Sequence, residues 1–284
     1  MSEQQQWASD LTLRFPAADT VDGVPCYAPE MIGAESGYDP TAHAELARLE
    51  AGNWWFTSRN QLIIDALTRY FPAPRSFLEI GCGNAFVLSG VHAALPGTRL
   101  AGTELFLSGL LEARRRLPVA FLAQMDARYI PFRETFGVIG AFDVIEHIEE
   151  DAAVLEQVWQ ALEPGGGLIL TVPQHEWLWS LADEQAHHVR RYTRRTLLDV
   201  VTRAGFEVLW TTSFVSFLVG PMAAARLIGD DSRRREDPYI DFRLSQRANS
   251  ALQSVARLER KVLRRGVTLP VGGSRILVAR KVAR

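Results

Sequence analysis

Cysteine is scarce in this chain, with only Cys26 and Cys82 among 284 residues. The two lie far apart and form no C-x-x-C pair, which argues against a zinc site or a disulfide framework and favours a reducing compartment. No apolar run approaches the roughly 20 residues that span a bilayer. The polar N-terminus, MSEQQQWASD, is no signal peptide. We therefore expect a cytoplasmic protein.

A large net charge is also absent, because the chain as a whole carries −2. The charge is nevertheless unevenly distributed. Residues 1–188 contain 11 Lys and Arg against 25 Asp and Glu, whereas residues 189–284 contain 20 against 8. The basic C-terminal third predicts either an anionic partner, such as a phosphorylated substrate or a membrane surface, or pairing with the acidic front of the same chain.

What the chain does contain is a strand, a glycine turn and a helix within residues 76–88, SFLEIGCGNAFVL. The apolar strand ends at Gly81, and Gly81 and Gly83 permit positive φ and a close approach of a ligand to the backbone. The N-terminus of the following helix offers unpaired N–H groups to a polar or anionic ligand. The pattern predicts a nucleotide-type site or, more simply, a structural turn.

The dinucleotide fingerprint G-x-G-x-x-G requires a third glycine for helix–strand packing, and Phe86 occupies that position here. The segment instead reads Glu79-x-Gly81-x-Gly83. It resembles the first motif of class I S-adenosylmethionine (SAM)-dependent methyltransferases, in which a further glycine often stands where this chain has Ala85. An NAD(P)-dependent enzyme is disfavoured by Phe86.

Later residues follow the order of the same family. The resemblance implies that Glu104, 21 residues after Gly83, accepts hydrogen bonds from the ribose hydroxyls, with Leu105 beside it. It implies that Asp126 and Ala127 contact the adenine. Asp143 completes the expected cofactor-binding set, after a strand that opens with Phe136-Gly137 where the family usually has an aromatic residue and aspartate.

Two further segments are typical of this family. Residues 143–147 read DVIEH, close to the family's D-V-L-E-H, and residues 162–173 read LEPGGGLILTVP. His147 is a candidate general base, since an unperturbed imidazole titrates near neutral pH, although the family uses this histidine structurally as well. The likeness is close over residues 77–173, looser over 41–60 and 174–192, and points to a bacterial subgroup similar to methyltransferase types 11 and 12.

Aromatic, histidine and arginine side chains concentrate in two segments that we expect to bind the acceptor. His187 and His188 are candidate bases, and the arginines are candidates to hold an anionic group. The predicted substrate-binding residues are Trp55, Arg59, His175, Trp179, Arg190, Arg191 and Tyr192. Alternatives are aromatic packing around residues 53–60 and a loop pinned to the sheet by its basic residues. We expect no metal, although His175, Asp183, His187 and His188 are ligand types.

The expected fold is a Rossmann-like, doubly wound α/β sheet of seven strands with the last one antiparallel. We divide the chain into an N-terminal cap with helices (1–75), a SAM-binding core (76–213), a helical insert (214–270) and a final strand of the core sheet (271–284), which alternates like an edge strand. The insert includes a basic amphipathic helix, residues 241–265, after a charged loop with Arg233, Arg234 and Arg235. It predicts an active-site cover, a homodimer contact or peripheral membrane contact.

The sequence thus predicts a SAM-dependent methyltransferase. We expect transfer to an oxygen of a small-molecule, sugar or lipid-linked acceptor, with a histidine as general base. An N-methyltransferase and a methyltransferase fold that only binds a partner are the alternatives. No nucleic-acid substrate is expected, because no N-P-P-Y-like motif for a flipped base is present.

Overall fold

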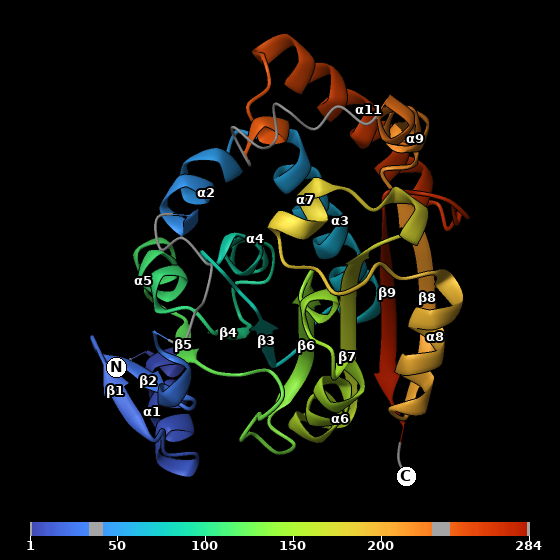
Figure 1. Ribbon diagram of the computed structural model, residues 1–284. Helices are drawn as coiled ribbons and strands as arrows, with labels where there is room; N and C mark the ends of the chain where they lie inside the picture. Colours follow the sequence, from blue (N-terminus) through green and yellow to red (C-terminus); the bar gives the residue numbers. More distant parts are fainter. Residues whose placement is uncertain (1, 34–41, 229–238, 283–284) are drawn as a thin grey trace.

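The computed structural model describes residues 2–33, 42–228 and 239–282. One nine-stranded sheet forms its centre, in the order β1-β2-β5-β4-β3-β6-β7-β9-β8 (Figure 1). The strands are β1 (Asp19–Val21), β2 (Val24–Cys26), β3 (Ser76–Ile80), β4 (Arg99–Glu104), β5 (Phe121–Gln124), β6 (Phe136–Phe142), β7 (Leu162–Pro173), β8 (Phe206–Phe214) and β9 (Ser274–Lys281). The doubly wound class and the antiparallel last strand are confirmed.

Two details of the predicted sheet were wrong. The strands number nine, because the β1–β2 hairpin continues the sheet beyond β5, with Cys26 opposite Gln124. The Gln124 side chain secures this edge by accepting from the N–H of Ala28 and donating to its carbonyl, at 3.1 and 2.9 Å. Moreover, β9 is no edge strand, because it pairs with both β7 and β8 and leaves β8 at the edge.

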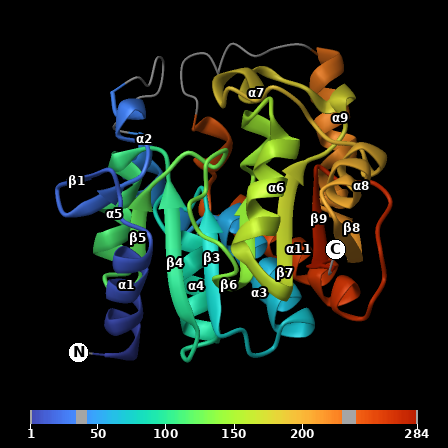
Figure 2. The ribbon, with the colours of Figure 1, turned by 90° about the horizontal axis from the view of Figure 1, so that it is seen from below.

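Helices cover both faces of the sheet. One apolar core joins its first face to α1 (Glu3–Arg14), α6 (Asp151–Ala161) and α8 (Arg194–Arg203). A second core joins the other face to α3 (Trp54–Tyr70), α4 (Phe86–Ala94), α5 (Leu107–Arg116) and α11 (Gln246–Arg264). Figure 2 shows α1 and α6 in front of the strands. The alternation of buried side chains along each strand therefore supplies both cores.

The N-terminal cap begins with a helix, α1, which no pattern in the sequence predicted. Helix α1 begins with a capping box in which Ser2 and Gln5 satisfy each other's backbone N–H groups. Trp7 and Leu11, one turn apart, are buried in the first core. Short helices α2 (Ala42–Glu50), α7 (Leu181–Gln185) and α9 (Val219–Ile228) complete the α-helices of the described chain.

The helical insert packs against α3. Arg260 donates to both carboxylate oxygens of Asp65 at 2.5 and 2.8 Å, and the Asn249 side chain accepts from the N–H of Trp54 at 2.8 Å. Glu259 accepts from the N–H groups of Val215 and Ser216, both at 2.8 Å. These contacts hold α11 against the helix that carries Trp55 and Arg59.

The side of α11 that faces away from α3 exposes both apolar and basic side chains, as the predicted membrane contact would require. Val255 and Leu258 are 42% and 63% exposed, and Arg257 and Lys261 are exposed beside them. Contact with a membrane or a second copy through this helix stays a prediction. None of the helices that the described residues form has an apolar stretch long enough to cross a bilayer. The arginines at 233–235 lie outside the described residues.

Candidate functional site

The chain reverses sharply where β3 ends. Gly81 and Gly83 have φ of +64° and +48°, and Ala85, the N-cap of α4, has φ of +57°. The turn is closed by the Ala85 N–H, which donates to the Cys82 carbonyl at 2.7 Å. Ala85 thus adopts the left-handed conformation that favours glycine, which agrees with the glycine that the resemblance leads us to expect at this position. The turn is preserved despite this departure.

Gly81 is required for two separable reasons. A Cβ there would lie 2.5 Å from Cγ2 of Val144, and its φ is positive. We expect Gly81→Ala to lower the free energy of unfolding by about 2–4 kcal/mol, through backbone strain and overpacking. Gly83→Ala is the matched control, because a Cβ at Gly83 would meet nothing within 4 Å. Denaturant titration checks both variants.

The rescue experiment separates the two causes. Adding Val144→Ala should restore part of the stability lost in Gly81→Ala, because it removes the steric clash. It should restore none of the stability lost in Gly83→Ala. That loss comes only from the left-handed backbone conformation, which costs an alanine roughly 1–2 kcal/mol of unfolding free energy. Equal losses for the two glycine variants, with no rescue of either, would contradict the steric explanation.

Acids follow two neighbouring strands beside this turn, at the carboxyl edge of the sheet. Glu104, at the end of β4, accepts from the N–H of Gly83 at 2.9 Å and from that of Leu105 at 2.7 Å. Asp126, after β5, accepts from the N–H and the guanidinium of Arg128 at 2.7–3.1 Å, while Ala127 packs against the first core. Both residues are at least nine-tenths buried, and when ionised both carboxylates act only as acceptors.

This arrangement fits SAM. The ribose hydroxyls and the adenine amino group of SAM are hydrogen-bond donors, and the carboxylates of Glu104 and Asp126 only accept when ionised. The space beside Gly83 is open to a ligand. Glu79, on β3, is buried, and its Oε2 has no hydrogen-bond partner in the described part of the chain. Burial raises the pKa of Glu79 to about 8, while the nearby Arg59 opposes this rise.

Arg59 and Asp143, predicted separately for the acceptor and the cofactor, form an ion pair with each other. Asp143 follows β6 and has φ of +57°, and the guanidinium reaches it from α3. Burial lowers the pKa of Arg59, and the nearby Glu79 and Glu146 raise it again. The pair connects the aromatic start of α3 to the carboxyl end of β6.

Two of the three predicted bases meet beside this pair. His147 and His188 lie with ring centroids 4.6 Å apart, and Nε2 of His188 lies 4.0 Å from Oε1 of the fully buried Glu146. Burial raises the pKa of Glu146 to about 8. Burial and the neighbouring His188 lower the pKa of His147 to about 4, so His147 is neutral and weakly basic at pH 7. His187 is exposed with φ of +56° and lies outside the group.

The loop after β7 is secured by its own polar side chains. Asp183 accepts from Nδ1 of His188 at 2.8 Å and from Arg191 at 2.7 Å, and its other oxygen accepts from Ser180. Burial raises the pKa of Asp183, but the hydrogen bonds from His188 and Arg191 outweigh burial and bring this pKa to about 2. Asp183 is therefore an anion that orients His188.

Three predicted substrate residues have partners within the protein. Arg190 and Tyr192 both contact Asp151 at the start of α6, at 2.7 and 2.5 Å, and Arg191 contacts Asp183. These contacts pin the loop to α6 and to itself, whereas the sequence-based alternative expected the sheet as the partner. An anion-binding role for these residues stays a prediction.

The predicted aromatic and histidine contacts are more dispersed. Trp55 stacks on Phe214 at the end of β8, with centroids 5.9 Å apart. His175 stacks on Trp177 at 5.2 Å, and Trp179 is half-buried. Their roles in acceptor binding stay predictions. Sequence reasoning missed Glu146, although it lies between the chosen Asp143 and His147, because no local pattern marks an acid as buried without a partner.

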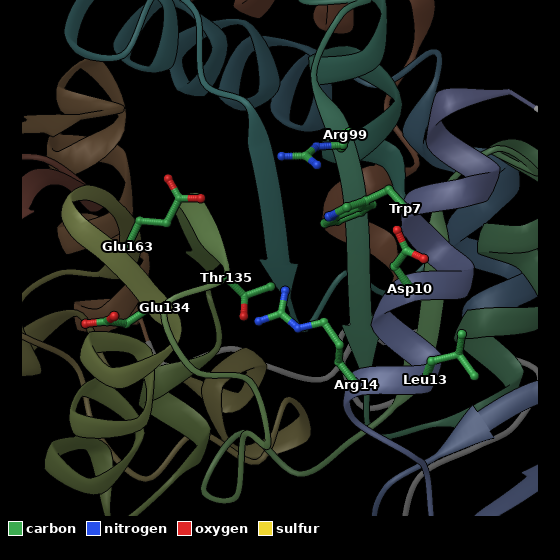
Figure 3. A pocket seen from close by; sticks show the side chains of 8 residues that line it. All are labelled: Trp7, Asp10, Leu13, Arg14, Arg99, Glu134, Thr135 and Glu163. Carbon is green, nitrogen blue, oxygen red and sulfur yellow. The ribbon is translucent and has the colours of Figure 1, made fainter.

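A hollow of about 430 Å³ lies away from these residues (Figure 3). It is lined at the amino ends of the strands by Arg99, Thr135 and Glu163, and by Trp7, Asp10 and Arg14 of α1. Ligands of doubly wound sheets bind at the carboxyl ends of the strands. The hollow is therefore separate from the candidate site.

Comparison with known proteins agrees with the geometry. The model of a methyltransferase domain family matches residues 55–210. A probable SAM-dependent methyltransferase of Mycolicibacterium smegmatis is 25% identical over 59% of this chain and 65% of its own length. A ubiquinone biosynthesis O-methyltransferase of Methylobacterium nodulans is 25% identical over 60% of this chain and 84% of its length.

The fold is likewise similar to solved methyltransferases. Phosphoethanolamine N-methyltransferase 2 of Haemonchus contortus, solved with SAM, gives a TM-score of 0.57 at 18% identity, over 88% of this chain and 59% of that one. The family match covers more than half of the chain, and the turn and its two neighbouring acids fit the methyl donor. The chain therefore belongs to the class I SAM-dependent methyltransferases, and SAM is its cofactor.

Proposed function

We propose that the protein transfers the methyl group of SAM to an oxygen atom of a small-molecule acceptor. The observation that carries this proposal is the group of Glu146, His147 and His188 at the carboxyl end of β6, beside the cofactor residues. Such a group suits an acceptor that must lose a proton. The names of two relatives, a ubiquinone biosynthesis O-methyltransferase and a trans-aconitate 2-methyltransferase, support a small acceptor.

SAM supplies an electrophilic methyl group, and the protein has to position the acceptor in line with it and take up the proton of a hydroxyl. We assign proton removal to the group around His188. Asp183 holds Nδ1 of His188 as a donor, so its Nε2 retains a lone pair toward Glu146. His147 is too weak a base for this step at neutral pH. Exposed His187 takes no part.

The test is methyl transfer from isotopically labelled SAM to a panel of acceptors, read by mass spectrometry. Phenols, hydroxy acids, sugars and polyprenylated phenols form the panel, and each is paired with its amine analogue. We expect label on hydroxyl compounds and none on their amine partners. Label on the amines alone would make the protein an N-methyltransferase. Binding of neither SAM nor its demethylated product, in a calorimetric titration, would leave only a partner-binding module.

A further inference from the structure

Glu146 is an unusual residue to find in the interior of a protein. Its side chain is fully buried, and neither carboxylate oxygen has a hydrogen-bond partner among the described residues. A buried carboxylate without a partner costs several kcal/mol, so such groups in proteins normally pair with a cation or coordinate a metal ion. The imidazoles of His147 and His188 lie close to it, whereas the Arg59 and Arg191 guanidiniums act on it electrostatically without a hydrogen bond.

Those imidazoles are oriented as ligands. The Glu146, His147 and His188 side chains each bring one donor atom into a region where all three atoms lie within 4.8 Å of one another. Because the Asp183 carboxylate only accepts, Nδ1 of His188 carries the proton and Nε2 has a free lone pair toward Glu146. A carboxylate that holds the second nitrogen of a histidine is the usual outer support of a metal-binding histidine.

The backbone also fixes the two segments together. Glu146 and His147 belong to the short helix η2 (Ile145–His147) after β6, and His188 follows α7. The N–H of Val189 donates to the carbonyl of Glu146 at 2.8 Å, and the N–H of His188 donates to that of Asp183 at 2.9 Å. Asp183 is itself held by Ser180 and Arg191. The three donor atoms are therefore preorganised by a closed hydrogen-bond network.

We propose that Glu146, His147 and His188 bind one divalent transition-metal ion. One carboxylate and two imidazoles suit Mn²⁺, Fe²⁺, Co²⁺ or Zn²⁺ better than Mg²⁺ or Ca²⁺, which prefer oxygen ligands. Ligand atoms about 2.1 Å from a shared ion lie roughly 3–3.4 Å apart. The 4.0 Å between Glu146 and His188 thus closes by less than about 1 Å, within reach of side-chain rotation. This proposal differs from the sequence-based expectation that the protein binds no metal.

The ion would lie beside the expected cofactor site, so we assign it a role in activating the acceptor. This role rests on the proposed function. Three protein ligands leave coordination positions for an acceptor hydroxyl or water. A bound cation lowers the pKa of a coordinated hydroxyl, so the hydroxyl gives up its proton more readily before it attacks the methyl group of SAM. The proton leaves to solvent, so the ion replaces the direct proton removal assigned to the group around His188. The Glu146, His147 and His188 side chains then serve as ligands, and His188 acts as the base only in the metal-free protein.

The experiment measures metal binding directly and separately from catalysis. The full-length protein is treated with chelator, dialysed and titrated calorimetrically with MnCl₂ and with ZnCl₂, and retained metal is counted after gel filtration. We expect one ion per chain for the native protein. Glu146→Gln, which preserves side-chain shape, and His188→Ala should each lose this stoichiometric binding. Asp183→Asn, which keeps all three ligands, should weaken it by about 10–100-fold.

His187→Asn is the matched control, since His187 is the adjacent exposed histidine and asparagine tolerates its positive φ. It should bind the ion as the native protein does. Circular dichroism and thermal melts establish that each variant is folded. No stoichiometric ion on the native protein, or equal binding by native protein and folded Glu146→Gln, would overturn the proposal.

The two proposals fail in distinguishable ways. SAM titrations of the metal-free protein report on the cofactor residues alone, because none of them belongs to the metal group. Methyl transfer to hydroxyl compounds that is unaffected by chelator and by Glu146→Gln would sink the metal's catalytic role and leave the O-methyltransferase intact. Stoichiometric metal binding with transfer only to amines would support the site and overturn the proposed acceptor.

Discussion

Glu104→Ala should weaken SAM binding by about 5–150-fold, equivalent to roughly 1–3 kcal/mol for buried donors that lose their acceptor. Glu104 is buried, with 9% of its surface exposed. Its carboxylate accepts hydrogen bonds from the backbone N–H groups of Gly83, Leu105 and Phe106. Glu104 therefore shapes the glycine turn, and we propose that it also accepts hydrogen bonds from the ribose hydroxyls of SAM. Calorimetric titration with SAM measures the combined loss.

A graded pair of variants separates these purposes. Glu104→Gln retains the side-chain length and one carbonyl oxygen but replaces the second oxygen with an amide donor. We expect it to bind SAM more weakly than the native protein and more tightly than Glu104→Ala. Glu163→Ala, at the opposite end of the sheet, is the control and should bind normally. Native affinity in Glu104→Ala would remove Glu104 from the ribose site.

Much of the fold was accessible from sequence because its signals are local. The buried runs of β3 and β6 are followed by Gly81 and Asp143, and the buried second half of β7 ends at Pro173, as expected for interior strands of a doubly wound sheet. The glycine turn and the acid Glu104 lie at fixed spacings along the chain, so their meeting at 2.9 Å followed from the topology of adjacent parallel strands.

Features that depend on long-range pairing were not accessible. The alternation in β9 predicts a strand, but only its pairing with both β7 and β8 determines that it is interior. The environment of Glu146 also depends on long-range contacts. The sequence shows Glu146 beside His147, but the proposed metal group needs His188, more than 40 residues later, and the complete burial of Glu146. Composition also located the basic insert without indicating that Arg260 binds Asp65 on α3.

The Arg59–Asp143 pair is a second interaction that sequence spacing did not reveal, and it should have the largest effect on stability. Their side chains are only 14% and 22% exposed. Arg59→Met should lower the free energy of unfolding by about 3–5 kcal/mol, because it leaves a carboxylate without its cation in a poorly solvated site. Arg115→Met is the control, since the pair of Arg115 with Glu112 is 73% exposed at the arginine and should cost no more than about 1 kcal/mol.

The penalty of Arg59→Met should also depend on pH, in a direction that the buried acids determine. Burial raises the pKa of Glu79 and of Glu146 to about 8 in the folded protein, from the ordinary glutamate value of 4.5, and Arg59 lowers both pKa values. Without Arg59 these pKa values rise further, so above about pH 8, where the folded native protein begins to ionise these acids, the folded variant keeps them protonated and loses more stability relative to its unfolded chain. Urea titrations should therefore give a larger stability deficit at pH 8.5 than at pH 5.

A double-mutant cycle with Asp143→Asn distinguishes the pair from general disruption. If Arg59 and Asp143 act as a unit, the double variant should lose less stability than the sum of the two single variants, with a coupling above 1 kcal/mol. The acids at Glu79 and Glu146 persist in every corner of the cycle, so their pH-dependent cost should appear wherever Arg59 is absent. Additive losses, with the same deficit at both pH values, would mean that Arg59 contributes through packing and not through its charge.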